Sequence, residues 1–266
     1  MRTTAYRYPY EHLILAMTLF LVLAIIAITV TATVCTSIIF LLGYILLSFY
    51  LTWSHHHSLI NSAQQVIEQE NPDLTHLIRE GAHRLAPGKV KVYITHNRSL
   101  NAYTFGLSSP KVIVLYSSLF KVMDSEEILF IIGHEMGHIV LGHTWLNSLV
   151  GGMAGIPSPY AAAAVLSLAF LWWNRACEYS ADRAGLLACG NPNKAISALI
   201  KLEAGVGATS MQAMQMAYQR IDAEDDTLWG NLSETLGSHP LLIKRINQIR
   251  KYASSTQYHR ISSQLS

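Results

Sequence analysis

The longest apolar stretch of this chain lies close to its N-terminus. Between Leu13 and Trp53 the sequence contains no charged residue and no histidine over about 40 residues. A single helix spans a bilayer with roughly 20 residues, so the stretch predicts two transmembrane helices with a turn near residues 31–33. A signal peptide is excluded, since its apolar core is only about 7–15 residues long. We therefore expect residues 1–54 to form a short tail and a transmembrane hairpin.

The charges beside this hairpin predict its orientation. Arg2 and Arg7 precede the first span, whereas the expected tip carries no Lys or Arg. The positive-inside rule then places both ends of the hairpin in the cytoplasm, which fits an integral protein of the cell inner membrane. Cys35, Cys177 and Cys189 follow no disulfide spacing, in agreement with a reducing compartment.

After residue 54 the pattern changes to short elements typical of a mixed globular domain. Residues 58–86 predict two short helices broken at Asn71-Pro72. Apolar and polar residues alternate from Val90 to Thr95, a β-branched run covers 112–116, and residues 101–106 fit a strand or turn. We therefore expect an α+β, mainly α, domain over residues 55–253 with a small β-sheet.

Polar residues at expected helix ends mark where the later helices begin. Asp124 with Glu127 fits a capping box, and Asn191-Pro192 predicts a second helix start. Pro240 suits the first turn of a last helix that ends near Tyr252. The Ser- and Gln-rich residues 254–266 then predict a flexible tail.

The helix that follows Asp124 carries the string His134-Glu135-Met136-Gly137-His138, an HExxH motif. Residues four apart on a helix point the same way, so His134 and His138 can bind one metal ion. Glu135 can then act on a water at that ion. This arrangement is typical of a zinc hydrolase, and we expect one Zn²⁺ per chain with Glu135 as general base.

A catalytic zinc needs a third protein ligand and an open position for water. The metzincin pattern HExxHxxGxxH is excluded, because Gly142 and His143 each miss its register by one position. The better candidate is Glu178, which shares a helical face with Asp182. Asp182 would then not bind the metal itself but would contact one of the residues that do. We interpret His143 as a polar helix-end residue, with an extra metal ligand as the alternative.

Several segments, taken in their order along the chain, resemble the M48 family of membrane-associated zinc metallopeptidases, which includes HtpX-like and Ste24-like proteases. The resemblance covers roughly residues 90–250 and implies a zincin-type (gluzincin) fold. The matching segments are Asn101-Ala102-Tyr103-Thr104-Phe105-Gly106, the HEMGH string at 134–138, Glu178 to Asp182, and His239-Pro240 with Arg245.

This resemblance also implies roles for individual residues. The implied zinc ligands are His134, His138 and Glu178. Glu135 would be the general base, and His239 would stabilise the tetrahedral intermediate. Arg245 would pair with Asp182, and the substrate groove would be lined by Asn101, Ala102 and Tyr103. The alternatives are that His239 caps the last helix and that Arg245 is a surface cation.

Residues 145–173 form a second long uncharged stretch. Because His138 and Glu178 must meet at one ion, the chain would have to cross the membrane an even number of times between them. Two crossings need about 40 residues, whereas this stretch has 29 and is interrupted by Gly and Pro. We therefore expect an apolar insertion packed in the core or at the membrane surface, which departs from the HtpX-like pattern and argues against a Ste24-like chamber.

These patterns together predict a membrane-anchored zinc-dependent endopeptidase. Family analogy suggests polypeptide substrates, in particular misfolded or membrane proteins, and a role in membrane protein quality control. A net charge of +2 gives no reason to expect a nucleic-acid partner. Two alternatives stay open: an intramembrane-type protease, and a catalytically silent zinc-binding membrane scaffold.

Overall fold

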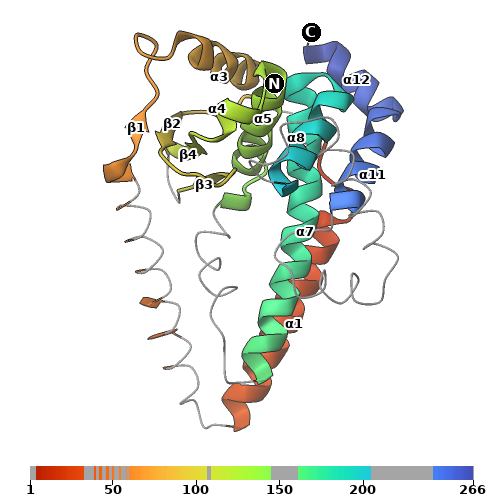
Figure 1. Cartoon of the computed structure of the whole chain (residues 1–266). Coiled ribbons are helices and arrows are strands. Elements are labelled where there is room, and N and C mark those ends of the chain that lie inside the picture. Colours follow the sequence, from red (N-terminus) through yellow and green to blue (C-terminus); the bar gives the residue numbers. More distant parts are fainter. Residues whose placement is uncertain are drawn as a thin grey trace.

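The computed structural model describes residues 4–32, 60–106, 109–144, 161–204 and 242–265, with single positions between 39 and 58. Helices predominate in these ranges, and one small sheet lies at one side of the domain (Figure 1), as the α+β, mainly α, expectation requires. Two long helices, α1 (Glu11–Ala32) and α7 (Ala161–Cys189), run side by side and extend away from the sheet.

The sheet has four strands in the described residues, in the order β1-β2-β4-β3. They are β1 (Gln64–Gln65), β2 (Val90–Thr95), β3 (Ala102–Phe105) and β4 (Lys111–Tyr116). β2 pairs parallel to β4, while β1 and β3 pair antiparallel to their neighbours. Ile113, Val114 and Leu115 of β4 are buried, and β3 lies at one edge of the sheet.

The strands expected over 90–95, 101–106 and 112–116 are therefore confirmed. The expected helix just before Asn71 is wrong where it includes Gln64–Gln65, since these residues form β1. A strand of two residues is too short to produce a recognisable alternation. The second helix of that pair is confirmed as α3 (Pro72–Leu85), which begins directly after Asn71.

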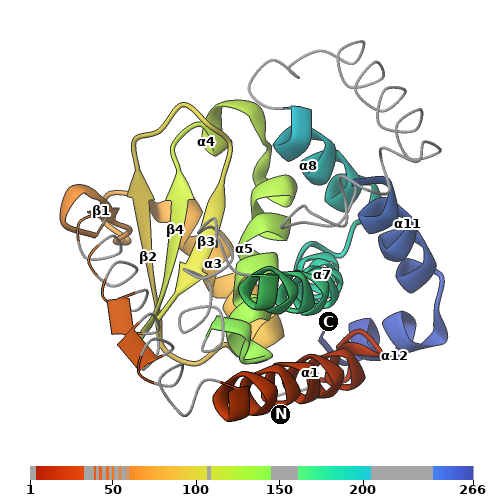
Figure 2. The ribbon, with the colours of Figure 1, turned by 90° about the horizontal axis from the view of Figure 1, so that it is seen from below.

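The remaining helices form a layer beside the sheet. They are α4 (Leu119–Val122), α5 (Ser125–Val140), α8 (Pro192–Ala204), α11 (Leu242–Ala253) and α12 (Thr256–Leu265). Figure 2 shows α5 and α7 between the sheet on one side and α8, α11 and α12 on the other. The main core includes buried residues from β4, α5, α7, α8 and α11.

Helix α5 starts with the predicted capping box. The Asp124 carboxylate accepts a hydrogen bond from the Glu127 N–H at 3.0 Å, and the Glu127 carboxylate accepts one from the Asp124 N–H at 2.9 Å. Every residue from Glu127 to Ile139 is buried. A helix enclosed on all sides in this way is a rigid support for the side chains it carries.

Two glycines of α5 allow α7 to approach unusually closely. A Cβ atom added at Gly133 would lie 2.3 Å from the Ala188 Cβ, and one added at Gly137 would lie 2.6 Å from the Ala184 Cβ. Both distances are far below van der Waals contact, so side chains larger than hydrogen are excluded there. These glycines neighbour His134 and His138 in sequence, and the close approach brings Glu178 of α7 to both histidines.

The expectation of a flexible tail over residues 254–266 is wrong. Residues 256–265 form α12, and its Tyr258 and Ile261 are buried against the main core. The two lie three residues apart, which is a helical spacing. The high content of Ser and Gln concealed this short apolar stripe.

One described helix is long and apolar enough to span a membrane, with the candidate span at Glu11–Ile28 in α1. The second span expected by residue 54 lies mostly outside the described residues, so the hairpin stays a prediction. Residues 145–160 of the apolar insertion also lie outside them, whereas 161–173 are helical and begin α7. Phe170 and Trp173 pack in a small cluster with Ile14 of α1.

Candidate metal centre

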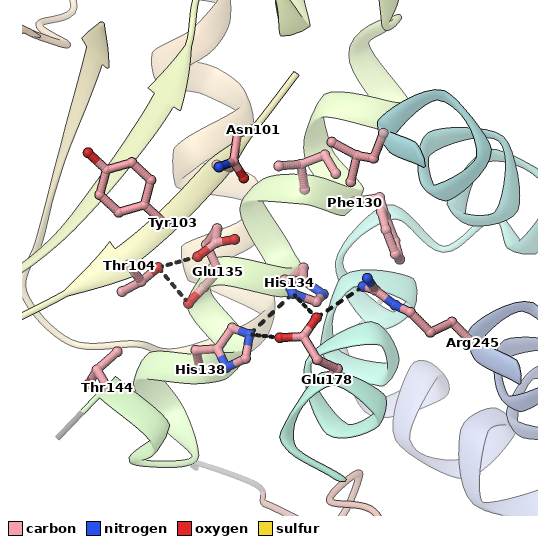
Figure 3. Close-up of a pocket in the computed structure, with 13 residues that line it drawn as sticks. Asn101, Tyr103, Thr104, Phe130, His134, Glu135, His138, Thr144, Glu178 and Arg245 are labelled. Carbon is pink, nitrogen blue, oxygen red and sulfur yellow. Dashed lines mark hydrogen bonds and ion pairs between the residues drawn. The ribbon is translucent and has the colours of Figure 1, made fainter. Parts of the chain in front are cut away.

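The three predicted metal ligands converge in the structure (Figure 3). The Nε2 atoms of His134 and His138 lie 3.2 Å apart. Glu178 of α7 faces both of them, with carboxylate oxygens 3.6 Å from His134 Nε2 and 3.5 Å from His138 Nε2. The predicted helical spacing and the close approach of α5 and α7 together produce this cluster.

A carboxylate fixes the orientation of the first histidine. His134 Nδ1 lies 3.0 Å from Asp182 Oδ1, and Asp182 also accepts hydrogen bonds from Arg245 at 2.6 and 2.9 Å. Because a carboxylate paired with arginine can only accept, the proton of His134 lies on Nδ1. The lone pair of His134 is therefore on Nε2, the nitrogen that faces Glu178.

Asp182 and Arg245 are both largely withdrawn from solvent, and each sets the charge of the other. Burial alone would raise the pKa of Asp182, but the Arg245 guanidinium holds that pKa below its usual range. Burial likewise opposes the charge of Arg245, yet the Asp182 carboxylate keeps the pKa of Arg245 above its usual range. The alternative that Arg245 is a surface cation is wrong, since its guanidinium also lies 3.4 Å from Glu178 Oε2.

His143 lies behind the second histidine and is buried. Its Nδ1 is 3.0 Å from His138 Nδ1, and its Nε2 is 3.0 Å from Glu11 Oε1 of α1. Burial lowers the pKa of His143 to about 4, so the ring is neutral at pH 7. His143 therefore lies just after the end of α5, as predicted, but it is buried against the outer nitrogen of His138 and is no extra ligand of the same ion.

The three converging groups fit a zinc ion. Imidazole nitrogen and carboxylate oxygen are ligands that Zn²⁺ takes, at about 2.0–2.2 Å, and a tetrahedral ion of that size separates its ligand atoms by about 3.3 Å. The observed separations of 3.2, 3.5 and 3.6 Å are close to this value. Three protein ligands also leave one tetrahedral position for water, as a hydrolytic site requires.

Glu135 is held beside this cluster by the edge strand. The Thr104 hydroxyl of β3 lies 2.5 Å from Glu135 Oε2 and 3.3 Å from the Glu135 carbonyl oxygen (Figure 3). A hydroxyl that donates to a carboxylate fixes the orientation of that carboxylate. Thr104 belongs to the predicted groove segment, but the sequence analysis predicted no separate role for this residue.

A cavity of about 210 Å³ opens over the ligands and Glu135. The predicted groove residues Asn101, Ala102 and Tyr103 line its side, and Arg245 lies at another side. Further lining residues are Thr104, Phe130, Ile131, Thr144 and Leu202. The edge strand β3, Glu135 and the three predicted metal ligands thus share one cavity.

Two further residues, His239 and Glu11, differ from the others in how they were predicted or described. His239 lies outside the described residues, so its role as an oxyanion stabiliser and the alternative as a cap both stay predictions. Glu11 was not recognised by sequence reasoning, because 132 residues separate it from His143. The one available signal was an acidic residue directly before a long apolar span.

Comparisons with known proteins agree with the geometry. The sequence profile of Peptidase family M48 matches residues 68–253. The plastoglobule-localized metallopeptidase 48 of Arabidopsis thaliana is 29% identical over 213 residues, which cover 75% of this chain and 62% of the plant protein. The chain thus spans less than two thirds of that relative's length.

Two bacterial proteins named as protease HtpX homologs are more distant but align over more of their length. The protein of Pseudarthrobacter chlorophenolicus is 23% identical, covering 77% of this chain and 82% of the relative. The protein of Ralstonia pickettii is 22% identical, covering 84% of this chain and 88% of the relative. Since the family profile spans most of the chain and includes the HExxH helix, the chain belongs to peptidase family M48, a family of metallopeptidases.

Proposed function

We propose that this chain is a membrane-anchored, zinc-dependent endopeptidase. The single observation that carries the proposal is the convergence of His134, His138 and Glu178 beside Glu135, in a cavity edged by β3. A bound zinc ion would act as a Lewis acid that lowers the pKa of a water molecule towards about 7 and polarises the scissile carbonyl.

Glu135 acts as the general base. Its carboxylate, held by Thr104, accepts the proton of the attacking water and later passes that proton to the leaving amine. His239 stabilises the negative charge that develops on the carbonyl oxygen. One Zn²⁺ per chain is sufficient for this scheme.

Substrate binds as an extended strand alongside β3. This strand lies at the edge of the sheet order β1-β2-β4-β3, and Asn101, Ala102 and Tyr103 line the cavity. Main-chain pairing at a sheet edge accepts many sequences, so it suits unfolded or damaged polypeptides. We therefore propose misfolded or membrane proteins as substrates and quality control as the role.

The metal site lies at one end of the candidate membrane span. Glu11 is the first residue of the span Glu11–Ile28, and it contacts His143 behind the site. This placement favours a site at the membrane surface over the intramembrane alternative. We further propose the inner membrane with the site on the cytoplasmic side, although Arg7, one of the two cations behind that orientation, is itself paired with Glu11.

Cleavage of casein and of the chain itself by the zinc-loaded, detergent-purified protein tests the proposal. Glu135→Gln is expected to abolish both activities while zinc stays bound. Glu126→Gln is the matched control, because Glu126 is an exposed carboxylate on the same helix that accepts a hydrogen bond from Asn191. Full activity in Glu135→Gln would overturn the base assignment, and a zinc-loaded parent that cleaves no member of a peptide library would favour the silent scaffold.

A further inference from the structure

The histidine ligands of the metal centre are supported in two different ways. His134 contacts a carboxylate directly, through Asp182. His138 instead contacts a second imidazole, His143, whose other nitrogen meets the Glu11 carboxylate. The result is a linear chain of hydrogen bonds from His138 through His143 to the first residue of α1.

The direction of these hydrogen bonds follows from what holds Glu11. The Arg7 guanidinium pairs with Glu11 Oε1, and the Ser180 hydroxyl donates to Glu11 Oε2. A carboxylate with these partners is charged and only accepts, so His143 Nε2 donates to it. A neutral imidazole has one N–H, which leaves His143 Nδ1 as an acceptor for the proton on His138 Nδ1. The lone pair of His138 is then on Nε2, which faces Glu178.

We propose that Glu11 and His143 are positioning residues of the metal centre: they fix the tautomer and orientation of His138, and they make α1 part of the site as well as a membrane anchor. The inference rests on the proposed zinc site. Hydrogen bonds to the outer nitrogen of a ligating histidine are a common means of orienting the ring and raising its basicity as a ligand.

The N-terminal segment is fixed well enough to serve this purpose. Arg7 also donates to the Leu141 carbonyl at 2.8 Å, just after the end of α5, and the Tyr8 N–H donates to Ser180 at 2.8 Å. Glu11 is 1% exposed, so water does not compete for its carboxylate. Figure 1 shows α1 lying along α7, the helix that supplies Glu178. A displacement of α1 would therefore be transmitted to His138.

A second metal site is the competing interpretation of the same cluster. Glu11, His143 and Cys177 each offer a ligand atom, and these atoms lie within 4.8 Å of one another. The contacts disfavour it, because both nitrogens of His143 are already hydrogen-bonded and Arg7 neutralises Glu11.

The test uses the full-length protein in detergent and measures zinc rather than activity. Zinc affinity comes from competition with a chromophoric chelator, and the Co²⁺-substituted protein gives a visible spectrum that reports ligand geometry. His143→Phe keeps a ring but removes both nitrogens, and Glu11→Gln keeps the size but removes the charge. His12→Gln is the matched control, since His12 is exposed in the same turn of α1.

We expect His143→Phe to weaken zinc affinity about 10- to 100-fold and to change the cobalt spectrum. Glu11→Gln should weaken affinity up to about tenfold, and it should have no further effect once His143 is replaced, because the two residues act through one chain of bonds. His12→Gln should match the parent. Thermal unfolding of the metal-free proteins checks folding, and if one variant fails to fold, the other decides.

Parental zinc affinity and cobalt spectrum in the folded variants would overturn the inference, as would fully additive effects of the two substitutions. A second zinc equivalent in the parent that both variants lose would overturn it in favour of the second metal site. A parent that binds no zinc at all would instead contradict the proposed function, so the two failures are distinguishable.

Discussion

Asp182 and Arg245 form a two-bonded ion pair, with Arg245 Nη2 2.6 Å from Asp182 Oδ1 and Nε 2.9 Å from Oδ2. The same Oδ1 accepts the Nδ1 proton of His134. The ion pair on α7 and α11 thus also contacts His134, a predicted metal ligand on α5.

Asp182→Asn is expected to lower zinc affinity about 10- to 100-fold. The amide of Asn can still accept one hydrogen bond, but its NH₂ group would oppose either Arg245 or His134. Chelator competition on the purified protein measures the effect. Glu126→Gln should leave zinc affinity at the parental value, and a similar loss in that control would point to general destabilisation.

Thr104→Val is expected to reduce kcat about tenfold without changing zinc affinity. The substitution keeps the branched shape that suits a strand but removes the hydroxyl 2.5 Å from Glu135 Oε2. A hydrogen bond to a charged group contributes about 1.5–3 kcal/mol, and part of it would be lost from the transition state. Thr104→Ser, which retains the hydroxyl, should recover most of the rate; equal losses in both variants would contradict the assignment.

How much of this site could be predicted depended on the sequence distance between its parts. His134, Glu135 and His138 follow from one helical spacing, and Glu178 follows from its spacing to Asp182 within α7. Local periodicity also predicted β2, β4 and the start of α5, because each depends on neighbours in sequence. The ligand geometry needed one further condition, the Gly133 and Gly137 contacts with α7, which no local pattern reveals.

The parts of the site that were not predicted depend on contacts between residues far apart in the sequence. Glu11 and His143 meet across 132 residues, and no local sequence pattern links the two positions. His143 therefore looked like a polar residue at a helix end. The wrong prediction of a flexible tail at α12 has another cause. Tyr258 and Ile261 lie at a helical spacing, but the high Ser and Gln content of the segment was given more weight than this spacing.

Removal of the metal is expected to lower the melting temperature of the protein. The Nε2 atoms of His134 and His138 lie 3.2 Å apart beside the Glu178 carboxylate, so a bound ion would join three side chains from two helices. Zinc at 100 times its dissociation constant would stabilise the fold by about 2.7 kcal/mol. Melting curves over a zinc titration measure this, with Mg²⁺ as the control because it prefers oxygen ligands. A melting temperature independent of zinc would contradict the metal site.

Gly137→Ala is expected to destabilise the protein strongly, by about 1–3 kcal/mol or more, because the new Cβ would lie 2.6 Å from that of Ala184. Gly81→Ala in α3 is the matched control. Its nearest neighbour would be the flexible Met136 side chain at 3.3 Å, and alanine favours a helix over glycine by about 1 kcal/mol. Thermal unfolding should therefore separate the two variants, and equal melting temperatures would show that α7 can move away from α5.

The cap of α5 predicts a dependence of stability on pH. The Asp124 side chain is partly buried, which alone would raise its pKa, but its hydrogen bond from Lys194 holds the pKa below the ordinary 3.8. A carboxyl with a lowered pKa in the folded state stabilises the protein above its unfolded pKa, and this contribution is lost as the pH falls through the folded value.

Asp124→Asn retains the helix cap but removes the charge, so it isolates this effect. The parent should be more stable than the variant by a few tenths of a kcal/mol at pH 7, since the ion pair is 37–43% exposed. The difference should shrink as the pH falls through the lowered folded-state pKa of Asp124, because protonation then removes the charge that pairs with Lys194. Asp124→Ala, which loses the cap as well, should cost about 1 kcal/mol at every pH. Denaturant unfolding at a series of pH values measures all three proteins, and a parent–Asn difference that persisted at acid pH would contradict the assignment of the charge to the Lys194 pair.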